Sequence, residues 1–94
     1  MSQYPSREME RQLEQQKRRH ILNHLEEVIF MATGDPVALR DHGDYIIIDH
    51  GHGTAQRAWT VRDSYLEMAY DIMDAALHGE YFDYKYRAED DKPW

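Results

Sequence analysis

Six aspartate and histidine residues between positions 41 and 52 are the side chains of this sequence best suited to chemistry. They are Asp41, His42, Asp44, Asp49, His50 and His52. Imidazole nitrogens and carboxylate oxygens are the ligands that zinc, manganese and iron take in proteins. The group Asp49, His50 and His52 therefore supports one hypothesis, a metal-binding or hydrolytic domain that uses these turns.

The same residues are also typical of turns, because aspartate and histidine next to glycine bond to nearby backbone groups. Gly43, Gly51 and Gly53 interrupt the cluster, and no further histidine completes a ligand set at a recognised spacing. The chain has no cysteine, which excludes thiolate ligands, a thiol nucleophile and disulfides. Turn formation is the favoured interpretation, so we assign no catalytic residue and no cofactor, and an enzymatic role is disfavoured.

The C-terminal third carries residues suited to binding another protein. Carboxylates recur along the second half of the chain, and most of the seven tyrosines follow position 65. Rigid aromatic rings mixed with charges are enriched at protein interfaces, and a row of carboxylates can imitate the phosphates of a nucleic acid. The leading hypothesis is a small acidic interaction module (a regulator, inhibitor or assembly factor) that binds its partner through Glu67, Asp71, Asp74, Tyr81, Phe82, Tyr84, Tyr86 and Trp94.

A third hypothesis is a homo-oligomer that binds a small ligand. It rests on the second predicted helix, which has more apolar residues than one sheet can cover, so that two copies could pair across a two-fold axis. Small size, acidity and the lack of cysteine are also similar, in a general compositional way, to the accessory proteins of phages and mobile elements. That similarity specifies no family.

The chain length, the net charge and the apolar runs of the sequence disfavour some classes of protein. Ninety-four residues correspond to one domain, 1–94. A net charge of −7 disfavours direct binding to a phosphate backbone. The longest apolar runs are far shorter than the ~20 residues that span a bilayer, so we expect no membrane segment and a cytoplasmic location.

The N-terminal part predicts a long helix. Residues 1–5 form a flexible leader, and Ser6 can cap a helix that continues to Ala32 without glycine or proline. Gly34 and Pro36 end it. One side of this helix should carry the apolar residues that recur every three or four positions, Met9, Leu13, Ile21, Leu25, Val28, Ile29 and Ala32.

From Val37 to Val61 the apolar period changes to two, which predicts three antiparallel strands joined by tight turns. The candidate strands are 37–40, 45–50 and 55–61, and three isoleucines place the second one at the centre of the sheet. In the third strand, Arg57 and Trp59 should share one face.

A second helix should follow, capped by Thr60 with Asp63 and ended by Gly79. Its apolar face should combine two neighbouring stripes. One contains Leu66, Ala69, Tyr70, Met73, Ala76 and Leu77, and the other contains Tyr65, Met68, Ile72 and Ala75. Residues 81–87 alternate as in a short strand, and 88–94 form a frayed acidic tail. The sequence thus predicts an α+β fold in the order α-β-β-β-α-β.

Overall fold

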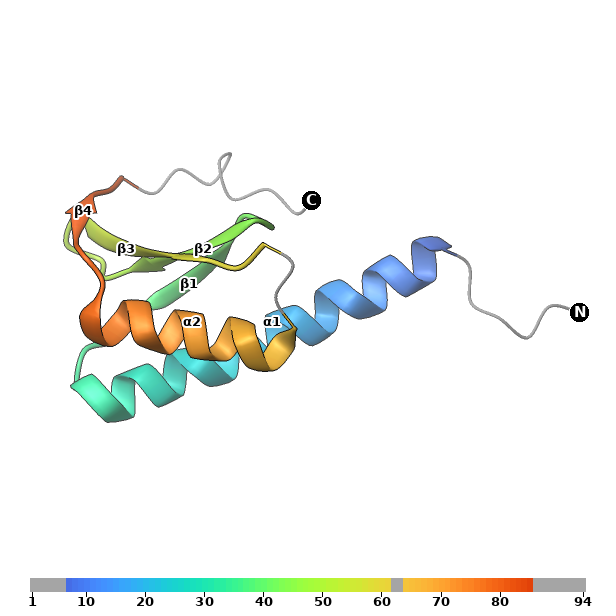
Figure 1. Cartoon of the computed structure of the whole chain (residues 1–94), viewed down its shortest axis with the longest axis horizontal. Helices are drawn as coiled ribbons and strands as arrows, with labels where there is room; N and C mark the ends of the chain where they lie inside the picture. Colours follow the sequence, from blue (N-terminus) through green and yellow to red (C-terminus); the bar gives the residue numbers. More distant parts are fainter. Residues whose placement is uncertain (1–6, 62–63, 86–94) are drawn as a thin grey trace, which may run out of the picture.

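A computed structural model describes residues 7–61 and 64–85 of the chain. Two helices lie on one face of a four-stranded antiparallel sheet whose strand order is β1-β2-β3-β4 (Figure 1). The predicted α+β class and element order are confirmed. The elements are α1 (Arg7–Thr33), β1 (Ala38–Asp41), β2 (Tyr45–Asp49), β3 (Thr54–Trp59), α2 (Tyr65–His78) and β4 (Phe82–Asp83).

Strand β4 is shorter than predicted, because only Phe82 and Asp83 pair with β3. The predicted leader (1–5), the tail (88–94), Asp63 and the end of the predicted strand 81–87 lie outside the described residues.

The register of β2 and β3 sorts their side chains onto two faces. Ile46 lies opposite Ala58, and Ile48 lies opposite Gln56. These four residues are buried and face the helices. The alternate residues face away, and we call that side the distal face of the sheet. By register it carries Ala38, Arg40, Tyr45, Ile47, Asp49, Ala55, Arg57, Trp59 and Phe82.

Glycine makes the two hairpin turns, as the sequence predicted. Gly43 adopts φ 86° and Gly51 adopts φ 81°, a left-handed conformation that costs other residues energy. The carboxylates of Asp41 and Asp49 each accept a hydrogen bond from the amide two residues later, at 2.9 Å. Both aspartates therefore stabilise the hairpin turns by accepting hydrogen bonds from the backbone.

The hydrophobic core lies between the sheet and the two helices. Helix α1 contributes Leu22, Leu25 and Ile29, whereas Met9 and Leu13 are about half exposed. The sequence pattern had grouped all of these except Leu22 on one face. Figure 1 shows the reason for the difference: the N-terminal part of α1 extends beyond the sheet and α2, so these elements do not cover it.

Helix α2 begins at Tyr65, five residues after the predicted cap. Ser64 is the N-cap, and its hydroxyl accepts a hydrogen bond from the Glu67 amide at 3.2 Å. The prediction of Thr60 was wrong because Thr60 belongs to the end of the sheet, where its amide donates to the carbonyl of Asp44 at 2.9 Å. A serine followed three residues later by glutamate satisfies the capping-box pattern equally well.

The buried side of α2 combines most of the second predicted stripe with part of the first. Met68, Ile72 and Ala75 face the core together with Ala76 of the first stripe, whereas Leu66, Tyr70 and Leu77 of the first stripe lie in solvent. Both stripes are apolar and adjoin each other on the helix, so periodicity alone did not determine which one meets the sheet.

Buried polar side chains tie the layers together. The guanidinium of Arg18 on α1 donates two hydrogen bonds to the carboxylate of Asp41 on β1, at 2.9 and 3.1 Å, and both side chains are less than one fifth exposed. Gln56 is 1% exposed and donates to the carbonyl of Gly79, beyond the end of α2, at 2.9 Å. These bonds fix each helix against a particular strand.

We predict that Arg18→Met lowers the free energy of unfolding by about 2 kcal/mol, because it leaves the largely buried Asp41 carboxylate without its cation. The matched control is Lys17→Met, one residue earlier, whose exposed ion pair with Glu14 should contribute less than about 0.5 kcal/mol. Urea denaturation of both variants measures the difference. Equal losses for the two variants would contradict this assignment.

Candidate functional site

The predicted acidic residues of α2 form a continuous row on its solvent side. Glu67, Asp71 and Asp74 are all exposed, and their spacing of four and three residues places them along one line of the helix. The row therefore presents three carboxylates to any molecule that approaches α2.

An exposed apolar row runs beside these carboxylates. Leu66 and Tyr70 are each 68% exposed, and Leu77 is 51% exposed. They also share one line of the helix, because they are spaced by four and seven residues. We call the two rows together the α2 outer face, defined by Leu66, Glu67, Tyr70, Asp71, Asp74 and Leu77.

The C-terminal aromatic residues do not all join this face. Tyr81 is exposed, and its ring centroid lies 5.1 Å from that of His50. Phe82 pairs with Ala55 and lies on the distal face, where its ring meets that of Tyr84 edge-on. The structure thus divides the predicted partner-binding set between two sides of the molecule. Tyr86 and Trp94 lie outside the described residues.

A cation and three aromatic rings gather on the distal face. The guanidinium carbon of Arg57 lies 5.0 Å from the ring centroid of Tyr45, 5.3 Å from that of Trp59 and 5.1 Å from that of Phe82. Such contacts are attractive because the ring faces carry partial negative charge. Alternation in β3 correctly put Arg57 and Trp59 on one face. It did not identify the cluster, because Tyr45 and Phe82 join it only through the strand register.

Two of the three predicted metal ligands, Asp49 and His50, bond to other side chains in this structure. Asp49 accepts a hydrogen bond from Arg40 at 3.1 Å, and Nε2 of His50 lies 2.8 Å from Oε1 of Gln56. His50 and His52 line one small pocket of about 220 Å³ with Tyr81 and Asp35. Within residues 7–61 and 64–85, no three histidine or acidic side chains are grouped so that they could hold a metal ion. The metal site stays a prediction.

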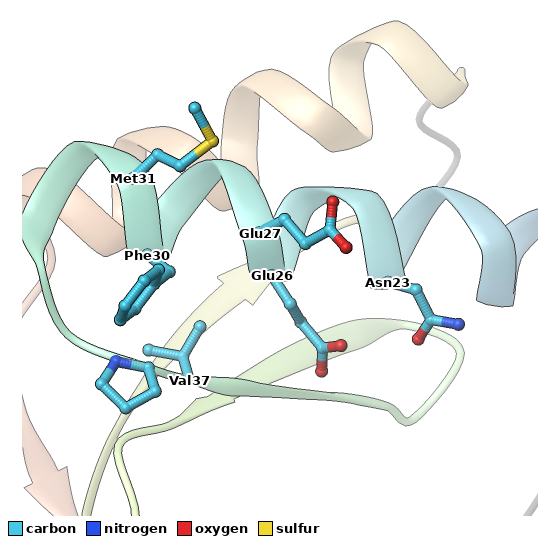
Figure 2. Close-up of a pocket in the computed structure, with 7 residues that line it drawn as sticks. Asn23, Glu26, Glu27, Phe30, Met31 and Val37 are labelled. Atoms are coloured by element: carbon cyan, nitrogen blue, oxygen red, sulfur yellow. The ribbon is translucent and has the colours of Figure 1, made fainter.

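A larger hollow of about 500 Å³ lies beside the C-terminal half of α1, lined by Asn23, Glu26, Glu27, Phe30, Met31, Pro36 and Val37. Figure 2 shows Phe30 and Val37 close together at one end, with the carboxylates of Glu26 and Glu27 farther along the helix. Glu26 already accepts the amide of Leu39 at 2.7 Å, whereas Glu27 is exposed. The hollow can therefore accept the apolar stem and cationic end of a basic side chain.

The pKa of Tyr65 is shifted by a contact between the two helices. The hydroxyl of Tyr65 donates a hydrogen bond to the carboxylate of Glu14, which joins the start of α2 to α1. This bond is the main reason that the pKa of Tyr65 is raised above 10.0; burial and the negative charge of Glu14 add to the shift. A raised pKa means that folding favours the neutral phenol. The stabilisation is present below pH 10 and is lost as the pH rises through the folded-state pKa.

Comparisons with protein-family models, with curated proteins and with solved structures give no match. Among the described residues, no helix combines the length and the apolar character needed to span a membrane. The fold and the exposed surfaces define a small α+β protein whose two helices cover one side of an antiparallel sheet.

We predict that Glu14→Gln moves the pKa of Tyr65 back towards its ordinary value, because an amide oxygen accepts the hydroxyl's hydrogen bond more weakly than a carboxylate does and carries no charge to oppose the phenolate. Titration of the Tyr65 ring by NMR measures this change. Glu10→Gln, at an exposed position one turn earlier on α1, is the control and should leave Tyr65 unchanged. An identical Tyr65 titration in the native chain and in Glu14→Gln would contradict the assigned contact.

Proposed function

We propose that this chain is a small interaction module, acting as a regulator, inhibitor or assembly factor, that binds a protein partner through the α2 outer face and through the exposed Tyr81, which follows the end of α2. The observation that carries the proposal is the exposure of Leu66, Tyr70 and Leu77 beside the row of carboxylates. Isolated apolar residues on a surface need no explanation, but a contiguous apolar row with a polar border is typical of a binding site.

Burial of the apolar side chains on this face supplies enough free energy for binding a partner. Removing a leucine or tyrosine side chain from water contributes about 1.5–3 kcal/mol, and a few such anchors supply most of the affinity of a typical interface. A helix with apolar residues along one line can lie in a groove of its partner. The carboxylates then form the rim, where charge mainly sets association rate and specificity.

The charges indicate what kind of partner fits. Glu67, Asp71 and Asp74 require lysine or arginine around an apolar groove, and the net charge of −7 would steer a basic partner towards the chain. Two copies paired through this face would instead bring together two chains that each carry a net charge of −7, so like charges would oppose their association. We therefore favour a basic partner protein over a homodimer.

A basic groove that normally holds nucleic acid is one partner surface with this chemistry. Carboxylates at positions 67, 71 and 74 recur about every 4.5–6 Å along the helix axis, which supports imitation of a phosphate row. The apolar row adds contacts that phosphate mimicry alone does not require, so the proposal rests on both rows. We place the interaction in the cytoplasm, because a chain without cysteine has no need of an oxidising compartment.

The proposal can be tested by photo-crosslinking followed by binding measurements. p-Benzoylphenylalanine at position 70 should crosslink a partner in cells of the native host, whereas the same residue at position 12, on the exposed N-terminal part of α1, should not. With the purified partner, Leu66→Ser and Leu77→Ser should each raise Kd about tenfold or more, measured by calorimetry.

Leu13→Ser is the matched control, because Leu13 is also a half-exposed leucine but lies on α1. It should leave Kd within about twofold. Equal weakening by Leu13→Ser and Leu66→Ser, or equal crosslinking from positions 12 and 70, would contradict the proposal. A dimer that forms through position 70 would favour the homo-oligomer instead.

A further inference from the structure

The two edges of the sheet differ in how far the rest of the chain satisfies their backbone hydrogen-bonding groups. At the β1 edge, the backbone of Leu39 points away from β2, and side chains of α1 satisfy both of its polar groups. Its amide donates to Glu26 at 2.7 Å, and its carbonyl accepts from Arg19 at 3.0 Å. Glu26 and Arg19 also form an ion pair at 3.7 Å. At Leu39, therefore, side chains of α1 already take the place of another strand.

The β3 edge is covered over only part of its length. Strand β4 pairs with Thr54 and Ala55 alone, so among the residues that the structure describes no strand neighbours residues 56–59 of β3 on that side. Figure 1 shows β4 at one end of β3 and the remainder of β3 running past it.

The backbone groups that point outward there can be identified from the hydrogen-bond pattern. The amide of His50 donates to the carbonyl of Thr54, and that of Thr60 donates to Asp44, so even-numbered residues of β3 bond to β2. The odd-numbered Arg57 and Trp59 therefore direct their amides and carbonyls towards the β4 side. Within the described ranges, these groups have no hydrogen-bond partner. We call them the β3 outer edge.

We propose that the β3 outer edge binds an extended peptide segment of a partner protein as an added strand. Two residues offer two donors and two acceptors in line, and a backbone group that is not paired within the protein must be paired with water or with another chain. Strand addition of this kind takes its affinity from main-chain hydrogen bonds and its specificity from alternate side chains.

The side chains beside this edge define the peptide. Arg57 forms no ion pair in residues 7–61 and 64–85, and three rings hold its guanidinium on the distal face. A carboxylate opposite Arg57 completes a cross-strand charge pair. Trp59 is 61% exposed and offers a flat ring to an apolar or aromatic residue two positions away. We therefore expect a three-residue motif in the peptide: an acidic residue opposite Arg57, then any residue, then an apolar or aromatic residue beside Trp59. The motif can run in either chain direction.

This inference is independent of the proposed function, because it concerns a different surface. Its first test is amide hydrogen exchange of the full chain by NMR, with no ligand added. The amides of Arg57 and Trp59 should exchange at least about 100-fold faster than those of Gln56 and Ala58, which bond to β2. Slow exchange at all four positions would overturn the proposal, since the edge would then be occupied already. If that slow exchange varied with protein concentration, a second copy of the protein would occupy the edge. If it did not, another part of the same chain would occupy it.

The second test uses peptides selected from a phage-displayed random twelve-residue library against the full chain. Enriched peptides should carry the expected spacing and should slow exchange at Arg57 and Trp59 at least tenfold. Methylating the peptide amides that face the edge should abolish binding, and methylating the alternate amides should not; this control leaves the protein unchanged. Arg57→Glu should weaken binding at least tenfold, whereas Tyr70→Ser should have no effect. A selection that yields no peptide with these properties would overturn the proposal.

Discussion

The pairing register between β2 and β3 determines every surface described above. Side chains alternate between the two faces of a strand, so a shift of one residue would exchange the buried and exposed sets completely. In the observed register, Ile46 and Ile48 meet Ala58 and Gln56 beneath the helices. The turn between these two strands holds this alignment, because Gly51 and Gly53 adopt left-handed conformations that other residues reach only at a cost.

The register also links the interior to the two proposed binding surfaces. Gln56 uses its buried amide to hold the C-terminal end of α2 at 2.9 Å, which fixes the side of α2 that remains exposed. One residue later, Arg57 must lie on the distal face, where Tyr45, Trp59 and Phe82 surround it. The helix face is acidic and the distal face is aromatic with a cation, so the protein can offer two chemically different surfaces to partners.

Periodicity was sufficient to predict the elements and their order. The glycine-free segment up to Ala32 and the three isoleucines at 46–48 indicated a helix and a central strand, and both are present. Periodicity was not sufficient where two adjoining stripes are apolar, as with Leu66 and Met68 on α2. Local patterns also could not reveal contacts made across the fold, such as those of Arg18 with Asp41 or Arg57 with Phe82, because those partners come together only after the strands and helices pack.

The register itself can be measured directly by NMR of the isolated protein. In antiparallel strands, residues opposite each other in a pair without mutual hydrogen bonds have closely spaced α-carbons. The structure therefore predicts strong contacts between the α-protons of Ile47 and Arg57 and between those of Tyr45 and Trp59. Contacts from Ile47 to Gln56 or to Ala58 in place of Arg57 would contradict the account, because the side chains assigned to the core and to both surfaces would then be exchanged.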